Sequence, residues 1–259
     1  YKLVPKRCVD MEHKQQVRYS RHLILPEIGE IGQNKLLKSS ALVIGAGGLG
    51  SPALFYLAAS GVGKIGVIDG DRVEISNLQR QILHETSDIG RLKAESARDS
   101  LEDLNPDLQI EAITKRLTQE NAEEIIGKYD VVLDGSDNFE TRFLVNDVCL
   151  KLKKPLVSAA ILRFEGQISV FNLNENSPCY RCLYSEIPPE GTMPTCELNG
   201  IFSPLAGMAG TMQAAEAIKI LAGLESSLNG NLLIFDALKM NFRKVKLPKD
   251  PNCACNSAN

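Results

Sequence analysis

The sequence predicts an α/β fold built on a Rossmann-like, mostly parallel sheet with helices on both faces. Two features predict it. Short apolar runs such as 41–44 and 130–134 alternate with helical segments from residue 30 to residue 172, and a glycine-rich loop at 45–50 joins the first run to a helix. The chain has 259 residues, of which 44% are hydrophobic, so it can bury one large core. We therefore expect a single domain over residues 1–259 with a C-terminal sub-lobe.

The pattern of apolar, proline and glycine residues gives the order of the elements. The expected strands span 41–44, 64–69, 108–114, 130–134, 155–160 and 166–172, followed by a late hairpin of strands 231–236 and 240–247. The expected helices span 11–25, 30–38, 91–104, 118–127, 138–152 and 205–222, with a further helix beginning at Ser51-Pro52. We take Thr118 as the N-cap of its helix and segment 176–204 as a long functional loop.

Charge and composition exclude several classes of function. The net charge is −3 and the isoelectric point is about 5.8, which gives no reason to expect a nucleic acid or an anionic membrane as a partner. No apolar run reaches the roughly 18 residues of a membrane span, and the N-terminus lacks the apolar core of a secretory signal. We therefore expect a cytoplasmic protein whose seven cysteines serve metal or thiol chemistry rather than disulfides.

The loop Gly45-Ala46-Gly47-Gly48-Leu49-Gly50 is a predicted phosphate-binding site. Glycines allow backbone N–H groups to approach a phosphate closely, and the helix that follows adds a partial positive charge at its N-terminus. Asp69 ends the next predicted strand, where a carboxylate can bind a ribose hydroxyl. This motif indicates a nucleotide-binding fold but not which nucleotide, so an NAD(P)-dependent oxidoreductase is an alternative at this point.

Charged residues beyond Asp69 favour ATP over a dinucleotide. The segment Ser76-Asn77-Leu78-Gln79-Arg80 is a polar cluster that ends in arginine, and Lys93 follows it. Two such cations suit a polyphosphate and the charge that develops on its α-phosphate. Asp134 ends the strand 130–134, and Asp137-Asn138 follow it. A carboxylate at the carboxyl end of a strand can hold the Mg²⁺ that a triphosphate carries.

Six motifs together resemble the MoeB/ThiF family, the bacterial relatives of ubiquitin-activating enzymes. They are Arg18-Tyr19-Ser20-Arg21-His22, Gly45–Gly50, Ser76-Asn77-Leu78-Gln79-Arg80, Asp137-Asn138, Glu165-Gly166-Gln167 and Cys179-Tyr180-Arg181-Cys182. The resemblance covers residues 15–255. It implies a homodimer that uses MgATP to form an acyl-adenylate on the Gly-Gly C-terminus of a ubiquitin-fold sulfur-carrier protein. The adenylate primes that tail to become a thiocarboxylate for molybdopterin or thiamine synthesis.

The resemblance also implies roles for individual residues. The family's nucleotide site carries over to Gly45, Gly47, Gly48, Gly50, Asp69, Ser76, Asn77, Leu78, Gln79, Arg80, Lys93, Asp137 and Asn138. Gly48 is expected to line the phosphates and Asp69 the ribose, while Arg80 and Lys93 contact the triphosphate with Asn77. Asp137 is the Mg²⁺-binding carboxylate most needed for the chemistry. Arg21 resembles the arginine finger that reaches into the partner subunit's site; without the resemblance it reads as an ordinary solvated arginine.

The cysteines fall into two groups. Cys179 and Cys182 have the spacing that supplies half of a tetrahedral zinc site. The family has a second pair near its C-terminus with two residues between the cysteines, whereas here the candidates Cys253 and Cys255 have one residue between them. Two unrelated thiol pairs are the alternative to a closed, structural Zn²⁺ site. Cys196 lies in the long loop where the family places a sulfur-transfer cysteine, and the alternative for it is an inert thiol.

Some alternatives lie within the wider family. An inactive scaffold, like the non-catalytic half of heterodimeric ubiquitin-activating enzymes, need not keep Arg21, Arg80 and Asp137, which are all present. A tRNA-modifying cyclase fits the cysteines less well than the sulfur-carrier branch. The sequence ends soon after Cys255, so we expect no C-terminal rhodanese domain and a separate sulfur donor protein. It begins with tyrosine, so residues 1–10 are read as trimmed or foreign, with Met11 as a natural start.

Overall fold

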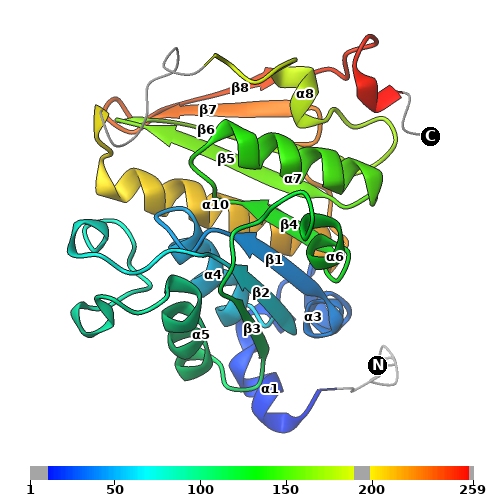
Figure 1. The fold of residues 1–259 in the computed structure, drawn as a ribbon. Coiled ribbons are helices and arrows are strands. Elements are labelled where there is room, and N and C mark those ends of the chain that lie inside the picture. The colour runs from blue at the N-terminus through cyan, green and yellow to red at the C-terminus, as the bar shows by residue number, and fades with distance from the viewer. Residues whose placement is uncertain (1–10, 190–198, 257–259) are drawn as a thin grey trace, which may run out of the picture.

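The computed structural model describes residues 11–189 and 199–256 (Figure 1). Its centre is one eight-stranded sheet with the order β3-β2-β1-β4-β5-β6-β7-β8. The strands are β1 Ser40–Ile44, β2 Lys64–Ile68, β3 Gln109–Ile113, β4 Val131–Asp134, β5 Leu156–Leu162, β6 Glu165–Phe171, β7 Asn231–Asp236 and β8 Asn241–Lys246. Strands β1 to β5 are parallel, whereas β6, β7 and β8 extend the sheet in antiparallel pairs. This architecture confirms the predicted fold class.

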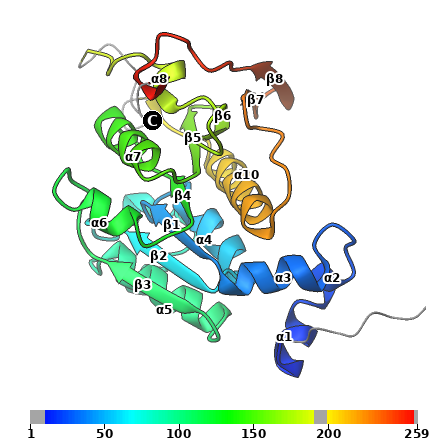
Figure 2. The same cartoon turned by 90° about the vertical axis from the view of Figure 1, so that its right-hand side faces the viewer.

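Helices cover both faces of the sheet, as Figure 2 shows from the side. They are α1 His13–Arg18, α2 Ser20–Leu23, α3 Gly29–Lys38, α4 Gly50–Ala59, α5 Lys93–Leu104, α6 Ala122–Ile126, α7 Phe139–Lys151, α8 Tyr180–Leu183 and α10 Ser203–Ala222, with short 3-10 turns η1 Ile75–Asn77, η2 Thr86–Asp88 and η3 Ala254–Asn256. Helices α3, α4, α5 and α10 bury residues such as Leu36 and Leu54 against one face. Helices α6, α7 and α8 bury residues such as Ile126 and Phe143 against the other.

The central strand β1 positions the site. Its residues 41–44 are all buried, and it lies between β2 and β4 with parallel pairing on both sides. A near-continuous apolar run is what a strand covered on both faces requires. Because β1, β2 and β4 run in the same direction, the segments that follow them lie at one edge of the sheet. Those segments begin at Gly45, Asp69 and Gly135.

Two of the expected helices are wrong in their extent. The helix expected over 11–25 is two short helices, α1 and α2, which meet at Tyr19. Tyr19 is buried, and its hydroxyl accepts a hydrogen bond of 3.0 Å from Asn105 Nδ2. This tertiary contact interrupts the helix at a point where the pattern of apolar residues predicted that it would continue. The helix expected from Thr118 begins only at Ala122, because the preceding residues form a turn in which Asn121 Oδ1 accepts from the Thr118 N–H at 2.8 Å.

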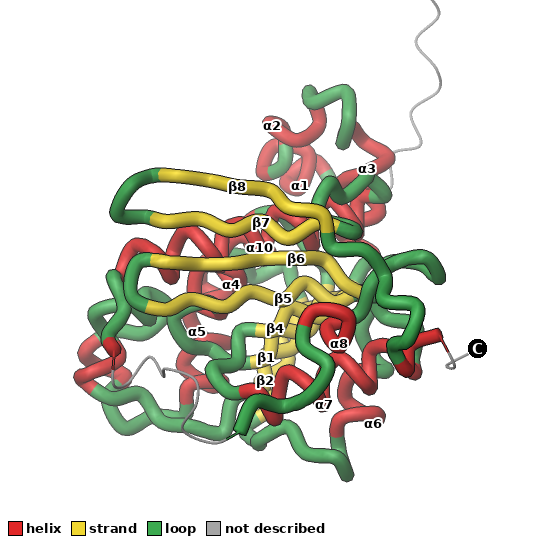
Figure 3. Tube along the Cα trace, turned by 90° about the horizontal axis from the view of Figure 1, so that it is seen from above, coloured by secondary structure: helices red, strands yellow, loops and turns green. Residues whose placement is uncertain are grey.

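The C-terminal part of the chain folds back over the antiparallel strands. The expected late hairpin is present as β7 and β8, which Figure 3 shows at the edge of the sheet. The segment expected to be one long loop contains the short helix α8, and its residues 190–198 lie outside the described part. Lys249 Nζ donates to the Glu175 carbonyl at 2.8 Å, which ties the C-terminal segment to the chain before α8. Within the described residues, no helix is both long and apolar enough to cross a lipid bilayer.

Candidate nucleotide and metal sites

The glycine loop and the turn after β4 touch each other. Gly45 has a φ of +89°, a conformation that favours glycine, and its N–H donates to the Ile68 carbonyl at 2.9 Å. A Cβ atom on Gly45 would lie 3.2 Å from the carbonyl oxygen of Gly135. The Gly135 N–H in turn donates to the Ile44 carbonyl at 2.9 Å. The parallel pairing of β1 with β4 therefore brings two predicted nucleotide-binding segments into contact.

Helix α4 starts at the end of the glycine loop. A Cβ atom on Gly50 would lie 1.9 Å from the Gly45 carbonyl oxygen, so only glycine fits this close backbone approach. Within the described part of the chain, the N–H groups of Gly47 and Gly48 have no hydrogen-bond partner. Free N–H groups at the start of a helix bind anions well, because the helix dipole adds a partial positive charge. The loop therefore offers N–H groups of the kind that a phosphate requires.

The Asp69 carboxylate is already bound to the loop. Its Oδ2 accepts a hydrogen bond from the Ala46 N–H at 2.8 Å, and its Oδ1 accepts from the Asp71 N–H at 2.8 Å. Each carboxylate oxygen has two lone pairs, so Asp69 can accept a further hydrogen bond from a hydroxyl. The structure thus places Asp69 beside the loop, as the sequence predicted, and adds that it fixes the loop backbone.

The segment 76–80 brings one arginine to the glycine loop. A Cβ atom on Gly48 would lie 3.4 Å from Arg80 Cγ, and Arg80 Nη1 donates to the Ser76 carbonyl at 3.1 Å. Gln79 Oε1 accepts from the Ser203 hydroxyl at the start of α10, the helix whose Ala206 also lies against Gly48. Asn77 Oδ1 accepts from the Glu74 N–H at 3.1 Å and so stabilises the turn η1.

The remaining predicted residues of this region differ in exposure. Ser76 is exposed and Leu78 is half-buried. Lys93 is buried at the start of α5, and its Nζ lies 3.5 Å from Asp71 Oδ2. Asp71 is two residues from Asp69, so Lys93 lies at the same edge of the sheet. Of the predicted cations, Arg80 therefore touches the loop directly, and Lys93 is linked to it through Asp71.

The turn after β4 contains two carboxylates in different states. Asp134 is buried, and both of its oxygens accept hydrogen bonds: Oδ1 from the Ser136 N–H at 3.0 Å and hydroxyl at 2.6 Å, and Oδ2 from the Ser158 hydroxyl at 3.1 Å. Asp137 is exposed, and within the described residues its one hydrogen bond is a contact of 3.3 Å from Asn138 Nδ2. Asn138 caps α7 by accepting from the Thr141 N–H at 2.9 Å. Asp137 is therefore the carboxylate left available for a cation.

Sequence reasoning missed Arg142, whose guanidinium holds the turn after β4 by a hydrogen bond. Its Nη2 donates to the Ser136 carbonyl at 2.9 Å. Burial alone would lower the pKa of Arg142, but the nearby Asp134 carboxylate raises it, so the guanidinium stays charged. The sequence could have indicated this contact. Arg142 comes four residues after the N-cap Asn138, so it lies one helical turn further on, on the same side of the helix as the cap.

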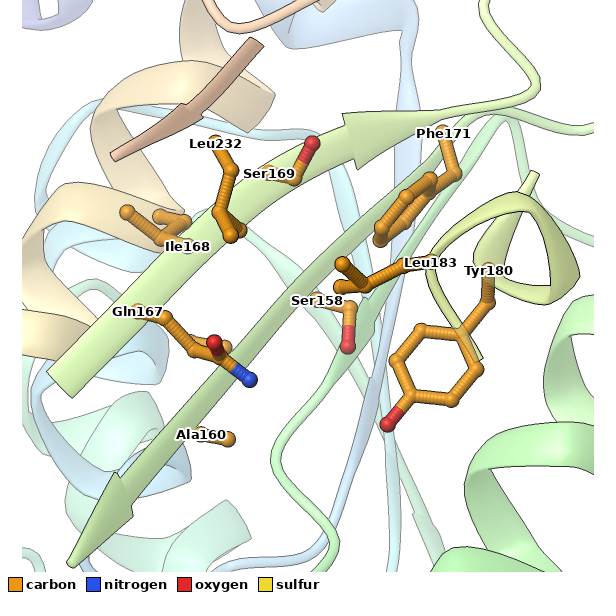
Figure 4. Close-up of a pocket in the computed structure, with 10 residues that line it drawn as sticks. Ser158, Ala160, Gln167, Ile168, Ser169, Phe171, Tyr180, Leu183 and Leu232 are labelled. Atoms are coloured by element: carbon orange, nitrogen blue, oxygen red, sulfur yellow. The ribbon is translucent and has the colours of Figure 1, made fainter. Parts of the chain in front are cut away.

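A small cavity between β5, β6 and α8 is a different feature (Figure 4). Its lining includes Ser158, Gln167 and Tyr180, which Figure 4 shows around it. Burial raises the pKa of the Tyr180 hydroxyl to about 12, so this group is neutral. The cavity volume is about 10 Å³, which is the space of a single water molecule. It is too small for a nucleotide.

Arg21 lies far from the glycine loop of its own chain. Its neighbour His22 contacts Gln33 at 2.9 Å, and Gln33 donates to the Ser60 carbonyl at 2.9 Å. Ser60 is the C-cap of α4, whereas the glycine loop is at the N-terminus of the same helix. Ten helical residues span about 15 Å. Arg21 itself is exposed, so the structure does not bring it together with the other predicted site residues of the same chain.

The four predicted metal-binding cysteines do come together. The Sγ atoms of Cys179 and Cys253 are 3.6 Å apart, those of Cys182 and Cys255 are 3.7 Å apart, and all four lie within 4.8 Å of one another. A tetrahedral ion with Zn–S bonds of about 2.3 Å requires sulfur–sulfur distances of roughly 3.8 Å. The cluster therefore fits a tetrahedral metal ion despite the single residue between Cys253 and Cys255.

The surroundings of the cluster also suit thiolates that bind a metal. The Asp250 N–H donates to Cys182 Sγ at 3.4 Å, and burial raises the pKa of the Cys255 thiol to about 12. A bound cation would offset that effect of burial, since coordination deprotonates a thiol. Cys196, the predicted sulfur-transfer residue, lies outside the described residues.

Comparison with known proteins gives matches over nearly the whole chain. The sequence profile of the ThiF family matches residues 19–256. The "Sulfur carrier protein adenylyltransferase" of Thermus thermophilus is 50% identical over 240 residues, which cover 91% of this chain and 89% of that protein. The "Adenylyltransferase and sulfurtransferase MOCS3" of Aedes aegypti is 46% identical over 256 residues, which cover 98% of this chain but 58% of that protein.

A solved structure shares the fold at low sequence identity. The Escherichia coli MccB chain, in a complex with MccA-N7isoASN, superposes with a TM-score of 0.83 at 21% identity, over 96% of this chain and 76% of that one. At this identity the likeness concerns the fold alone.

Proposed function

The chain belongs to the ThiF family and is a nucleotidyltransferase, and from this premise we propose that it uses ATP to adenylate the C-terminal glycine of a ubiquitin-fold sulfur-carrier protein. The observation that carries the proposal is the contact between the glycine loop and the turn after β4, at Gly45 and Gly135. That contact joins the glycine loop, with its free N–H groups, to the turn that carries the exposed carboxylate of Asp137. An oxidoreductase would need neither the available carboxylate nor Arg80, and family membership removes that alternative.

The reaction joins two anions and needs mainly positioning and charge stabilisation. A carboxylate oxygen of the carrier attacks the α-phosphorus of ATP, the new P–O bond forms, and the bond to pyrophosphate breaks. The free N–H groups of Gly47 and Gly48 would hold phosphate oxygens. Arg80, whose stem packs beside Gly48, would neutralise the developing charge, with Lys93 in support. Asp69 would accept a hydrogen bond from the ribose.

Asp137 is the proposed ligand of Mg²⁺. Carboxylate oxygens suit this hard cation, and Asp137 is exposed at the carboxyl end of β4. Asp134 is a poorer candidate because both of its oxygens already accept hydrogen bonds. When bound, Mg²⁺ would neutralise the triphosphate and make pyrophosphate a better leaving group.

A homodimer would complete the site with Arg21 of the partner subunit. Arg21 is exposed and lies at the opposite end of α4 from its own glycine loop, which argues against action within one chain. Several apolar side chains near it are also exposed: Val17, Ile24, Leu25 and Ile31. A subunit interface would explain both the exposed apolar side chains and the distance of Arg21 from its own glycine loop. The homodimer and the residue roles in the nucleotide site both belong to this proposal.

The four-cysteine cluster is proposed to bind one structural Zn²⁺. Three of the sulfur–sulfur distances are 3.6 to 3.9 Å and all are within 4.8 Å, which suits a tetrahedral ion. Four thiolates leave no open position for a substrate. The ion would tie the C-terminal segment to α8 and stabilise this part of the fold.

Other parts of the proposal rest on the family resemblance alone. The carrier would be of the molybdopterin or the thiamine type, and its Gly-Gly tail would become a thiocarboxylate. A separate protein would donate the sulfur, and Cys196 would act as the nucleophile after adenylation. A cytoplasmic location and a single adenylation domain over residues 1–259 stay predictions.

The test is carrier-dependent exchange of pyrophosphate into ATP. We expect exchange only when both Mg²⁺ and a carrier with an intact Gly-Gly terminus are present, and mass spectrometry should show the carrier heavier by one adenylyl group. A carrier that lacks the last glycine is the matched control and should give no exchange. Absence of exchange with both the molybdopterin-type and the thiamine-type carrier would count against the proposal.

A further inference from the structure

His84 lies next to the glycine loop and has no role in the adenylation reaction proposed for this chain. It is 6% exposed and belongs to the connection between β2 and α5. Its Nε2 atom lies 2.9 Å from the carbonyl oxygen of Ala46, the second residue of the loop, and its Nδ1 atom lies 2.7 Å from Ser96 Oγ on α5. Both ring nitrogens therefore have polar partners, and one of the partners is the loop backbone.

The partners decide which ring nitrogen carries the proton. A carbonyl oxygen only accepts hydrogen bonds, so Nε2 of His84 is protonated and donates to Ala46. Nδ1 faces the hydroxyl of Ser96, whose one hydrogen is donated to Asp88 Oδ2 at 2.9 Å. Ser96 therefore helps to fix the position of the ring, whereas the Ala46 carbonyl requires the proton on Nε2.

The charged groups around the ring favour its neutral form. Burial is the main cause that lowers the pKa of His84, and the positive charge of Lys93 lowers it further. The Ala46 carbonyl, Asp88 and Asp69 act in the opposite direction, but the net pKa is below that of a free histidine. A neutral ring with its proton on Nε2 is therefore the state expected at neutral pH.

The hydrogen bond to Ala46 orients the next peptide N–H. The Ala46 N–H is held by Asp69 Oδ2 at 2.8 Å and its carbonyl by His84, so the residue is fixed at both ends. The described peptide bonds are all trans, and in a trans peptide the C=O and N–H bonds point in opposite directions. The N–H of Gly47 therefore points away from His84, and among the described residues it has no acceptor.

We propose that His84 is a positioning residue for ATP, which fixes the Ala46 carbonyl and thereby presents the Gly47 N–H to a phosphate. Ser96 is the second residue of this arrangement, because its hydroxyl contacts the other ring nitrogen of His84. Asp88 Oδ2 lies 2.9 Å from Ser96 Oγ and anchors the serine, while Arg91 Nη1 holds Asp88 Oδ1 at 2.6 Å. The inference rests on the proposed function, because it needs a substrate with phosphate groups to accept the hydrogen bond.

Two substitutions at His84 separate positioning from mere packing. Glutamine places an amide N–H close to the position of Nε2, so His84→Gln can keep the hydrogen bond to Ala46. His84→Leu keeps an apolar side chain of similar bulk and removes the donor. Ser96→Ala keeps the Nε2 donor of His84 but removes the hydroxyl that contacts Nδ1 and helps to fix the ring. Ser100→Ala is the matched control, because Ser100 is one turn further along α5 and its hydroxyl contacts only the Leu83 and Ser96 carbonyls.

The experiment measures ATP binding by titration calorimetry, with Mg²⁺ and without carrier, and then the KM values for both substrates. We expect His84→Leu to weaken ATP binding by about 10- to 100-fold, because a loop carbonyl loses its donor and the Gly47 N–H loses its direction. The KM for ATP should rise while the KM for the carrier stays unchanged. His84→Gln should bind ATP nearly as the wild type does, Ser96→Ala should be intermediate, and Ser100→Ala should be unchanged.

Nitrogen-15 spectra of the His84 ring give a readout that does not depend on activity. The wild type should show a protonated Nε2, because the Ala46 carbonyl can only accept a hydrogen bond. If wild-type protein binds no ATP, the proposed function fails. If it binds ATP but His84→Leu binds equally tightly, only the positioning role is overturned. If His84→Leu does not fold, an unprotonated Nε2 in the wild-type spectrum overturns the role instead, because His84 would then have no hydrogen to donate to Ala46.

Discussion

The backbone of Gly45 lies against that of Gly135, so close that a Cβ atom on the first would be 3.2 Å from the carbonyl oxygen of the second. The two residues follow β1 and β4, which pair in parallel. This contact joins a loop with free N–H groups to a turn that carries an available carboxylate.

Asp137→Ala should reduce carrier-dependent pyrophosphate exchange by about 100-fold or more, because the proposed Mg²⁺ ligand and its charge are lost. The fold should be unchanged, since Asp137 is exposed and caps no helix. Glu140→Ala is the control: Glu140 is an exposed acid in the first turn of the same helix and should keep its activity. Equal exchange in both variants would remove Asp137 from the site.

Arg21 and Asp137 should complement each other across a dimer. Arg21→Ala alone is expected to reduce exchange by about 100-fold or more, because a cation at the transferred phosphate is lost. A mixed dimer of Arg21→Ala and Asp137→Ala subunits holds one intact site, and random exchange of equal amounts makes half of the dimers mixed. Mixing should therefore restore about a quarter of the wild-type activity.

Arg18→Ala is the control for this experiment. Arg18 is exposed on α1 and donates to the Leu104 carbonyl at 3.0 Å, so its loss should affect stability slightly and exchange little. Subunit exchange should be verified by mass spectrometry of differently tagged chains. A mixture that exchanges subunits and yet stays inactive would place Arg21 outside the partner's site.

The cysteine cluster should contain one Zn²⁺ per chain by elemental analysis, because four converging thiolates satisfy one tetrahedral ion. Chelation should lower the melting temperature by about 5 °C or more, since the binding free energy adds to that of folding. Cys255→Ser should melt at a lower temperature from the start and respond weakly to chelator. Metal-free protein from zinc-replete cells, with melting insensitive to chelator, would contradict a metal site.

The free energy of unfolding should depend on pH through His84. Burial lowers the folded-state pKa of His84 below its unfolded value of about 6.5. Below pH 6.5 or so, the unfolded chain therefore binds a proton that the folded chain does not, and stability falls as the pH drops through the folded pKa. His84→Gln removes this titration. In urea denaturation at pH 7.5 and 5.5, wild-type protein should lose more stability than His84→Gln, whereas parallel losses would mean that His84 is not shifted.

Cys196→Ala should separate the two halves of the reaction. Adenylation needs no thiol, so pyrophosphate exchange should stay near the wild-type rate. A thiol-sensitive covalent adduct between enzyme and carrier should disappear, because the proposed nucleophile is gone. Cys149→Ala is the control, since Cys149 is buried and has no access to the carrier. Persistence of the adduct in Cys196→Ala would assign the nucleophile to another residue.

The sequence alone determined the parts of this protein that depend on local chemistry. An apolar run at 41–44 followed by Gly45 predicted a buried strand that ends in a tight glycine turn, and the structure has both. The spacing of Cys179 and Cys182 indicated half of a metal site in the same way. These features are readable because a strand, a tight glycine turn and a cysteine pair each depend on residues that are neighbours in the chain.

Only the tertiary structure decided what depends on contacts between distant segments. It showed that Asp134 is occupied by hydrogen bonds while Asp137 is available, and that Arg21 lies at the far end of α4 from its own loop. It also brought Cys253 and Cys255 to the other pair despite their tighter spacing, and placed His84 on the Ala46 carbonyl. The physical reason is that hydrogen-bond occupancy and through-space distance are set by how strands and helices pack, and no local pattern of residues records that packing.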